Sequence, residues 1–166
     1  MKYINQSVDL SRLFLTSLPE WLAEVEIRGS FWCSNNQLTS LAGAPAKVHR
    51  DFYCYNNQLT SLVGAPAKAH GDVSCHKNQL TSLAGAPAKV QGDFRCANNL
   101  LTSLAGAPAK VQGNFYCNDN QLTSLAGAPA KVQGNFYCEN NPGKFTEEDV
   151  RKVCDVKGVV IFNRIL

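Results

Sequence analysis

Six cysteines stand at a constant step along the chain and are its first candidates for chemistry. They occupy positions 33, 54, 75, 96, 117 and 138, which are 21 residues apart, and a seventh is Cys154. Such a ladder could bind a metal, relay electrons or form disulfides. A structural zinc site usually draws on a Cys-x2–4-Cys pair, which the sequence lacks, and thiols that point the same way from parallel strands bridge poorly. We therefore expect reduced, buried cysteines that pack as small apolar side chains, Cys154 included.

Two His-x-Asp pairs, His49/Asp51 and His70/Asp72, could hold a metal or exchange protons, because imidazole titrates near neutral pH. No nucleophile, pocket residue or glycine-rich phosphate loop accompanies them in the sequence. We therefore expect surface contacts from these pairs. The sequence predicts no catalytic residue, no metal ligand and no cofactor, and so a protein that is not an enzyme.

Five lysines form a second ladder with the same step: Lys47, Lys68, Lys89, Lys110 and Lys131. About 5 Å apart, neighbouring ammonium groups repel by roughly 0.8 kcal/mol in water. A basic stripe can bind phosphates, but one lysine per unit without arginines or aromatic rings is more typical of a solvated face. We expect this stripe on the return side of each coil.

The composition is that of a folded chain with little net charge. The 166 residues are 45% hydrophobic, and 16 Lys and Arg against 13 Asp and Glu give +3, too weak a charge to indicate nucleic acid. No apolar run is long enough to span a membrane. The first seven residues turn polar before a signal region forms, so we expect no secretory signal and a cytoplasmic protein, with delivery into a host cell left open.

The elements that carry these ladders are internal repeats. Five full units occupy 31–51, 52–72, 73–93, 94–114 and 115–135, and a truncated sixth occupies 136–141. A degenerate unit with a two-residue insertion precedes them, from Leu15 to Ser30. The chain is predicted to be one solenoid domain: 1–30 an N-terminal cap with the degenerate repeat, 31–141 the repeats, and 142–166 a C-terminal α/β cap.

The pattern of each unit predicts one strand, followed by a segment without a helix that leads back to the next strand. From Val48 to Cys54 the residues alternate with period two, with Val, Gly, Phe and Cys facing inward in most copies. Identical units stack in parallel about 4.8 Å apart, so seven rungs span about 30 Å. Asn57 and its equivalents are expected to be buried amides that satisfy the backbone of a bend. Leu59 and Leu62 then point inward, and Gly64-Ala65-Pro66 excludes a helix.

The pattern Phe-x-Cys-x-x-Asn-x-Leu-x-x-Leu resembles the leucine-rich-repeat core motif, with Phe and Cys at two leucine positions. The Asn-Gln-Leu-Thr-Ser-Leu…Pro stretch is similar to the short-repeat class of bacterial effector and phage proteins, and the likeness covers residues 15–141. It implies short parallel strands on a concave face and an irregular convex side. That class has about twenty residues per turn, whereas this unit has one more, at the glycine, which predicts a bulge or a longer strand. Enzymes of the effector class carry a separate catalytic domain, for which the residues after the repeats are too few.

Both ends are expected to carry caps. Thr146 is a predicted N-cap for a helix from about 147 to 154, and 159–162 is a predicted last strand. These elements would cover the open edge of the solenoid. At the other end, 21–25 is expected to close the first coil.

The outward positions of the predicted strand hold nearly all the differences between the units. Trp, Tyr and Arg, which are enriched at binding hot spots, gather there with charged residues. The predicted partner-binding residues are Trp32, Asp51, Tyr53, Tyr55, Asp72, His76, Asp93, Arg95, Tyr116 and Tyr137. The alternative is that stacked rings only stabilise the sheet across its rungs, or that these positions are unconstrained.

These observations predict a non-catalytic module that binds another protein through its concave sheet, with the aspartates orienting a basic partner. The alternative is a carbohydrate or polyanion module that uses the aromatic residues or the lysine stripe. Membrane and nucleic acid are not expected as partners. Self-association through the sheet edge or the aromatic face stays open.

Overall fold

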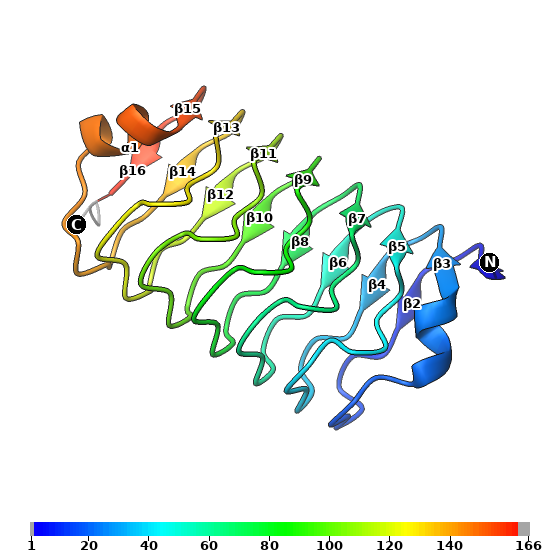
Figure 1. Ribbon diagram of the computed structural model, residues 1–166. Helices are drawn as coiled ribbons and strands as arrows, with labels where there is room; N and C mark the ends of the chain where they lie inside the picture. Colours follow the sequence, from blue (N-terminus) through cyan, green and yellow to red (C-terminus); the bar gives the residue numbers. More distant parts are fainter. Residues whose placement is uncertain (1, 163–166) are drawn as a thin grey trace.

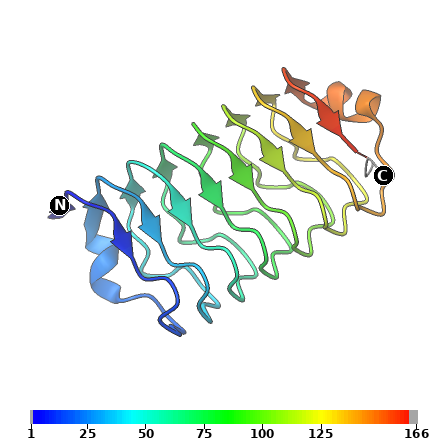
Figure 2. The same cartoon turned by 180° about the vertical axis from the view of Figure 1, so that it is seen from behind.

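The computed structural model describes residues 2–162 and shows a solenoid of eight coils, whose two ends carry the chain termini (Figures 1 and 2). Each coil contributes one strand to each of two parallel eight-stranded sheets. The lysine sheet consists of β1 (Lys2–Ile4), β3 (Val25–Ile27), β5 (Lys47–Val48), β7 (Lys68–Ala69), β9 (Lys89–Val90), β11 (Lys110–Val111), β13 (Lys131–Val132) and β15 (Asp155–Val156). The aromatic sheet consists of β2 (Val8–Asp9), β4 (Phe31–Trp32), β6 (Phe52–Tyr53), β8 (Val73–Ser74), β10 (Phe94–Arg95), β12 (Phe115–Tyr116), β14 (Phe136–Tyr137) and β16 (Val160–Ile161).

The prediction of one continuous strand from Val48 to Cys54 is wrong, because a bend at 49–51 divides this segment into β5 and β6. The extra residue of each unit therefore forms a corner between two sheets, and neither a bulge nor a longer strand. The corner position does not point inward as predicted: Arg50 is exposed. At Gly92 the backbone packs so closely on the coil before it that a Cβ would lie 2.1 Å from Oδ1 of Asp72. Only glycine fits such an approach.

The core lies between the two sheets and the return segments. Val48, Phe52, Cys54, Leu59 and Leu62 are all fully buried, which confirms the predicted inward positions other than the glycine. The phenylalanine rings stack from rung to rung, with centroids 6.0 Å apart for Phe31–Phe52 and 5.7 Å apart for Phe94–Phe115. Burying each such side chain contributes roughly 1.5–3 kcal/mol.

The predicted asparagine ladder is confirmed. Nδ2 of Asn57 donates to the carbonyls of Cys33 and Cys54, each at 3.0 Å, and Oδ1 accepts from the N–H of Leu38 at 3.0 Å. One amide thus joins its own turn to the preceding coil. The residue before each of these asparagines has a positive φ, and these are Asn35, Asn56, Lys77, Asn98, Asp119 and Asn140.

The ends hold two rungs that the repeat pattern does not reveal. At the N-terminus β1 and β2 form a complete rung before the degenerate unit, so eight rungs replace the predicted seven. A 3-10 helix, η1 (Glu20–Glu24), closes the next coil, with Leu22 buried and Trp21 exposed.

At the C-terminus the predicted helix is confirmed as α1 (Glu147–Val153), which begins with a capping box between Thr146 and Asp149. The last strand, β16, is shorter than the predicted 159–162. Asp155–Val156, directly after the helix, is strand β15, so the cap repeats the two-strand layout of the coils. Figure 1 shows α1 at this end of the row of coils.

Residues 1 and 163–166 of the predicted caps lie outside the described residues. No helix in 2–162 has the length and apolar character needed to cross a membrane.

Candidate binding surfaces

The outer face of the aromatic sheet brings together the predicted aromatic residues. In strands β4, β6, β10, β12 and β14 the phenylalanine points into the core, so the residue after it points out. Trp32 pairs in register with Tyr53, and Arg95 with Tyr116, which pairs in turn with Tyr137. All five are half-buried. The sheet therefore presents one row of large side chains along the solenoid, interrupted at Ser74, which is buried.

Arg95 is held in the middle of this row by two carboxylates and a ring. Its Nη1 donates to Oδ2 of Asp72 at 3.0 Å, and its Nη2 to Oδ2 of Asp93 at 2.7 Å. The guanidinium lies 5.4 Å from the centroid of the Tyr116 ring, within the range of a cation–π interaction. Partial burial disfavours the charge, but the hydrogen bond to Asp72 and the charge of Asp93 outweigh it and raise the pKa of Arg95.

Two pairs of rings stack across rungs on this face. Tyr116 and Tyr137 have centroids 4.4 Å apart and planes 9° apart, and Tyr55 stacks on His76 at 4.6 Å. Oγ of Ser74 lies 2.8 Å from Nδ1 of His76; the serine is 3% exposed, so the contact holds the ring and does not present a nucleophile. Burial lowers the pKa of His76 and raises that of Tyr116. The stacking stabilises the sheet and also fixes the rings in place.

The aspartates that were expected to orient a partner hydrogen-bond to the backbone of the next coil. Oδ1 of Asp51 accepts from the N–H of Asp72 at 2.9 Å, Oδ1 of Asp72 from Asp93 at 2.8 Å, and Oδ1 of Asp93 from Asn114 at 2.7 Å. Asn114 continues the ladder to Asn135 at 2.8 Å. The sequence does contain a sign of this ladder. The position after the corner glycine is Asp in some units and Asn in others, and both residues carry a short side chain with an acceptor oxygen. Both carboxylate oxygens of Asp72 are therefore engaged within the protein.

A polar depression of about 270 Å³ lies at the N-terminal end of the aromatic sheet. Nε1 of Trp32 and Oγ of Ser34 are buried there without a hydrogen-bond partner among residues 2–162, and Ser34 is 1% exposed. A buried donor without an acceptor costs about 1–3 kcal/mol. The lining residues are Asp9, Ser11, Arg12, Trp32, Ser34, Asn35, Tyr53 and Tyr55. Sequence analysis missed Asp9, Ser11 and Arg12 because the first rung carries no repeat motif.

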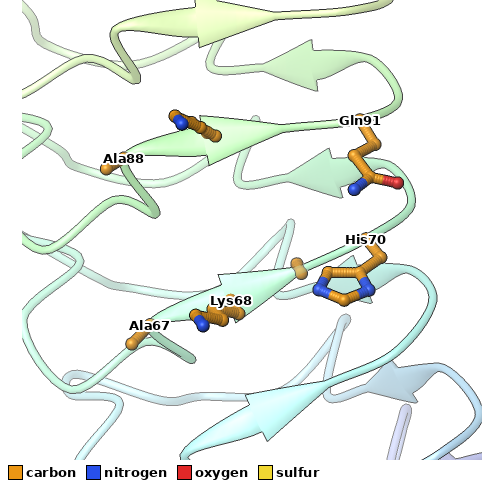
Figure 3. Close-up of a pocket in the computed structure, with 7 residues that line it drawn as sticks. Ala67, Lys68, His70, Ala88 and Gln91 are labelled. Carbon is orange, nitrogen blue, oxygen red and sulfur yellow. The ribbon is translucent and has the colours of Figure 1, made fainter.

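The lysine ladder lies on the outer face of a second sheet, the lysine sheet, and His70 and Gln91 lie beside it. The bend at the corner turns residue 49 and its equivalents away from the aromatic sheet, so these side chains are separated from the predicted partner-binding residues. A groove of about 410 Å³ is lined by Ala67, Lys68, Ala69, His70, Ala88, Lys89 and Gln91. Figure 3 shows Lys68, His70 and Gln91 on the same side of the two adjacent rungs.

The two His-x-Asp pairs do not act as pairs. Nε2 of His49 contacts Oε1 of Glu26, which also accepts from Nζ of Lys47 at 2.9 Å. The hydrogen bond from His49, followed by that from Lys47, lowers the pKa of Glu26. Asp51 lies in the corner ladder instead. Within the described part of the chain, no group of three or more His, Cys, Asp or Glu residues is placed to hold a metal ion.

All seven cysteines are buried and carry free thiols, which confirms their predicted burial. Burial raises the pKa of Cys75 to about 12 and that of Cys154 to about 11. Because the thiolate is the nucleophile and the metal ligand, these side chains serve packing in the folded protein.

No model of a known protein family matches the chain, and no curated protein matches it. One matching solved structure is described as a Shigella effector LRR domain; the match has a TM-score of 0.60 and 18% sequence identity. It covers 95% of this chain and 81% of that chain. The predicted leucine-rich-repeat fold is thereby confirmed, with two sheets and a repeat of 21 residues.

Proposed function

We propose that this leucine-rich-repeat solenoid is a non-catalytic protein-interaction module, and that the outer face of its aromatic sheet is the binding surface. The observation that carries the proposal is the row of Trp32, Tyr53, Arg95, Tyr116 and Tyr137 beside a depression whose buried donors lack acceptors. Trp, Tyr and Arg supply most of the affinity at protein interfaces. The likeness to a leucine-rich-repeat domain supports an interaction module in general.

The surface is formed before any partner arrives. Arg95 is fixed by Asp72, Asp93 and Tyr116, and Tyr116 by Tyr137. Side chains that are already ordered lose little conformational entropy on binding, so more of the contact energy appears as affinity. Because Arg95 is neutralised by two carboxylates, we propose that the partner contributes apolar and hydrogen-bonding groups to this face.

Stacking of a sugar is a weaker explanation of the same residues. A sugar needs the open face of a ring, whereas Tyr116 faces Tyr137 and Tyr55 faces His76. Stacking covers one face of each of these four rings, which leaves less ring surface for a sugar.

The test is affinity capture with three baits: wild type, the face variant Tyr53→Ala/Tyr55→Ala/Tyr116→Ala, and the control variant Lys89→Ala/Gln112→Ala on the lysine sheet. Circular dichroism and urea unfolding establish that all three are folded. A protein captured by wild type and by the control, but not by the face variant, is then purified and its affinity for each bait measured. We expect at least a tenfold loss for the face variant alone. Capture of the same proteins in equal amounts by all three baits would rule out the aromatic sheet as the surface.

A further inference from the structure

We propose that the outer face of the lysine sheet is a second binding surface, which takes an acidic, extended polypeptide segment lying along the solenoid. This surface is separate from the aromatic sheet, and the inference does not rest on the function proposed for that sheet. Its basis is the arrangement of charge on the lysine sheet.

Four lysines in successive rungs have no carboxylate of their own. Lys89, Lys110 and Lys131 pair in register, as Lys47 does with Lys68. Lys47 is neutralised by Glu26, but no ion pair involves the other four lysines within residues 2–162. The acidic residues in this line stand at its ends, Glu26 beside Lys47 and Asp155 beside Lys131. The middle of the sheet is therefore uniformly basic.

The lysines are close enough that their electrostatic potentials add. Rungs lie about 4.8 Å apart, which is less than the Debye length of about 8 Å at physiological salt. The fields of neighbouring lysines therefore overlap, and a ligand with several negative charges gains from all of them at once. A single carboxylate gains little.

The groove provides a seat for an extended chain. Ala67 and Ala88, one residue before Lys68 and Lys89, are small, so they leave room for a backbone beside the row of lysines. In Figure 3 the side chains of His70 and Gln91 lie along the other edge. Gln112 and Gln133 repeat this exposed amide in the next rungs. Ammonium groups on one edge and amides on the other match a peptide, which offers both carboxylates and backbone carbonyls.

The same face lacks what single-stranded nucleic acid requires. Bases stack on aromatic side chains, and no Phe, Tyr or Trp stands on the outer face of the lysine sheet from Lys47 to Lys131. The two imidazoles there, His49 and His70, pack edge to face on each other at 5.6 Å, and Tyr3, at the first rung, is covered by Arg28 at 5.0 Å. Strands β5, β7, β9, β11 and β13 also contain no arginine, whose fork holds phosphate with two parallel hydrogen bonds; Arg50 lies at the corner after β5. An acidic peptide is therefore the better match.

The experiment measures the fluorescence anisotropy of a labelled peptide of alternating glutamate and glycine, compared with its glutamine analogue. We expect the glutamate peptide alone to bind, and its affinity to fall steeply between about 50 and 200 mM salt, since the contacts are exposed charges. The variant Lys89→Glu/Lys110→Glu should weaken binding at least tenfold. Lys77→Glu/Lys144→Glu makes the same change in net charge away from this sheet and should leave the affinity within twofold of wild type.

Further measurements distinguish a peptide from a nucleic acid as the ligand, and the lysine sheet from the aromatic sheet as the site. Oligothymidylate of equal charge should bind more weakly than the glutamate peptide, and tighter binding would overturn the assignment to a peptide. Equal losses in the two charge variants, or binding of the glutamine analogue, would overturn the lysine sheet as a site. The aromatic-face variant Tyr53→Ala/Tyr55→Ala/Tyr116→Ala should bind the glutamate peptide like wild type, so failure of one surface is distinguishable from failure of the other.

Discussion

Oδ1 of Asp72 accepts a hydrogen bond from the backbone N–H of Asp93, one rung further along the solenoid, at 2.8 Å. The same side chain uses Oδ2 to hold Arg95. One aspartate therefore joins two coils through its first oxygen and orders the proposed binding face through its second.

Asp72→Ala and Asp72→Asn separate these two tasks. Alanine leaves the N–H of Asp93 without its acceptor, which should cost about 1–3 kcal/mol. Asparagine keeps an acceptor oxygen, as Asn114 does in the same ladder. It loses only the ion pair to a partly exposed Arg95, which should cost less than about 1 kcal/mol. Urea unfolding measures both, and equal losses would show that the backbone hydrogen bond contributes nothing.

Lys77→Asn should stabilise the protein by up to about 1 kcal/mol. Lys77 has a φ of 53°, a left-handed conformation that costs most residues energy but suits asparagine. Asn56 and Asn98 occupy the equivalent positions in the neighbouring coils. Lys68→Asn is the control, since Lys68 lies in a strand. Thermal and urea unfolding of both variants check the prediction, and an equal change in both would point to lost positive charge as the cause.

Glu26→Gln should destabilise the protein at neutral pH and have progressively less effect in acid. Its hydrogen bonds from His49 and Lys47 lower the pKa of Glu26 in the folded protein below the ordinary 4.5. Its charge therefore adds stability that is complete above that value and is lost as the pH falls through the lower, folded pKa. Unfolding curves across acidic pH give the difference between wild type and variant. Glu24→Gln, at an exposed carboxylate, is the control, and a constant difference for Glu26→Gln would refute the linkage.

The seven thiols should react with an alkylating reagent only as fast as the protein unfolds. All are buried, and burial raises the pKa of Cys75 and of Cys138 to about 12, so the reactive thiolate is scarce near neutral pH. Mass spectrometry after timed labelling should find the intact protein unmodified in buffer and seven adducts in denaturant. Rapid labelling of any one cysteine in buffer would show local opening of that coil.

The sequence was sufficient to predict what repeats within one unit. Phe52, Cys54, Asn57 and Leu59 recur at fixed positions, and their burial follows from periodicity and from the need to satisfy a buried amide. The corner at Arg50 was not predictable, because alternation of small and large residues is the same in one strand of seven and in two strands joined by a bend. The close approach of Gly92 to Asp72, which shows how tightly the corners of successive coils pack, depends on contacts between units.

The candidate site was harder to predict from the sequence than the core, because its contacts join different units. The bond between Arg95 and Asp72 links residues 23 apart, and so depends on the stagger between two coils. The depression at Trp32 needs Asp9 and Arg12, which belong to a rung without any repeat motif. Hydrophobic periodicity locates the core of such a rung poorly, since strands of two or three residues are too short to show it.

The ladder of Asp and Asn oxygens makes the length of this protein adjustable. Units 94–114 and 115–135 end in the same residue, and each offers its neighbour the same acceptor and the same donor. If residues 94–114 were removed, Oδ1 of Asp93 would meet the N–H of Asn135 in place of the N–H of Asn114. Gaining or losing a coil therefore requires no new core, and the chain can grow or shrink in steps of about 4.8 Å while each step adds or removes one lysine and one set of variable outward positions.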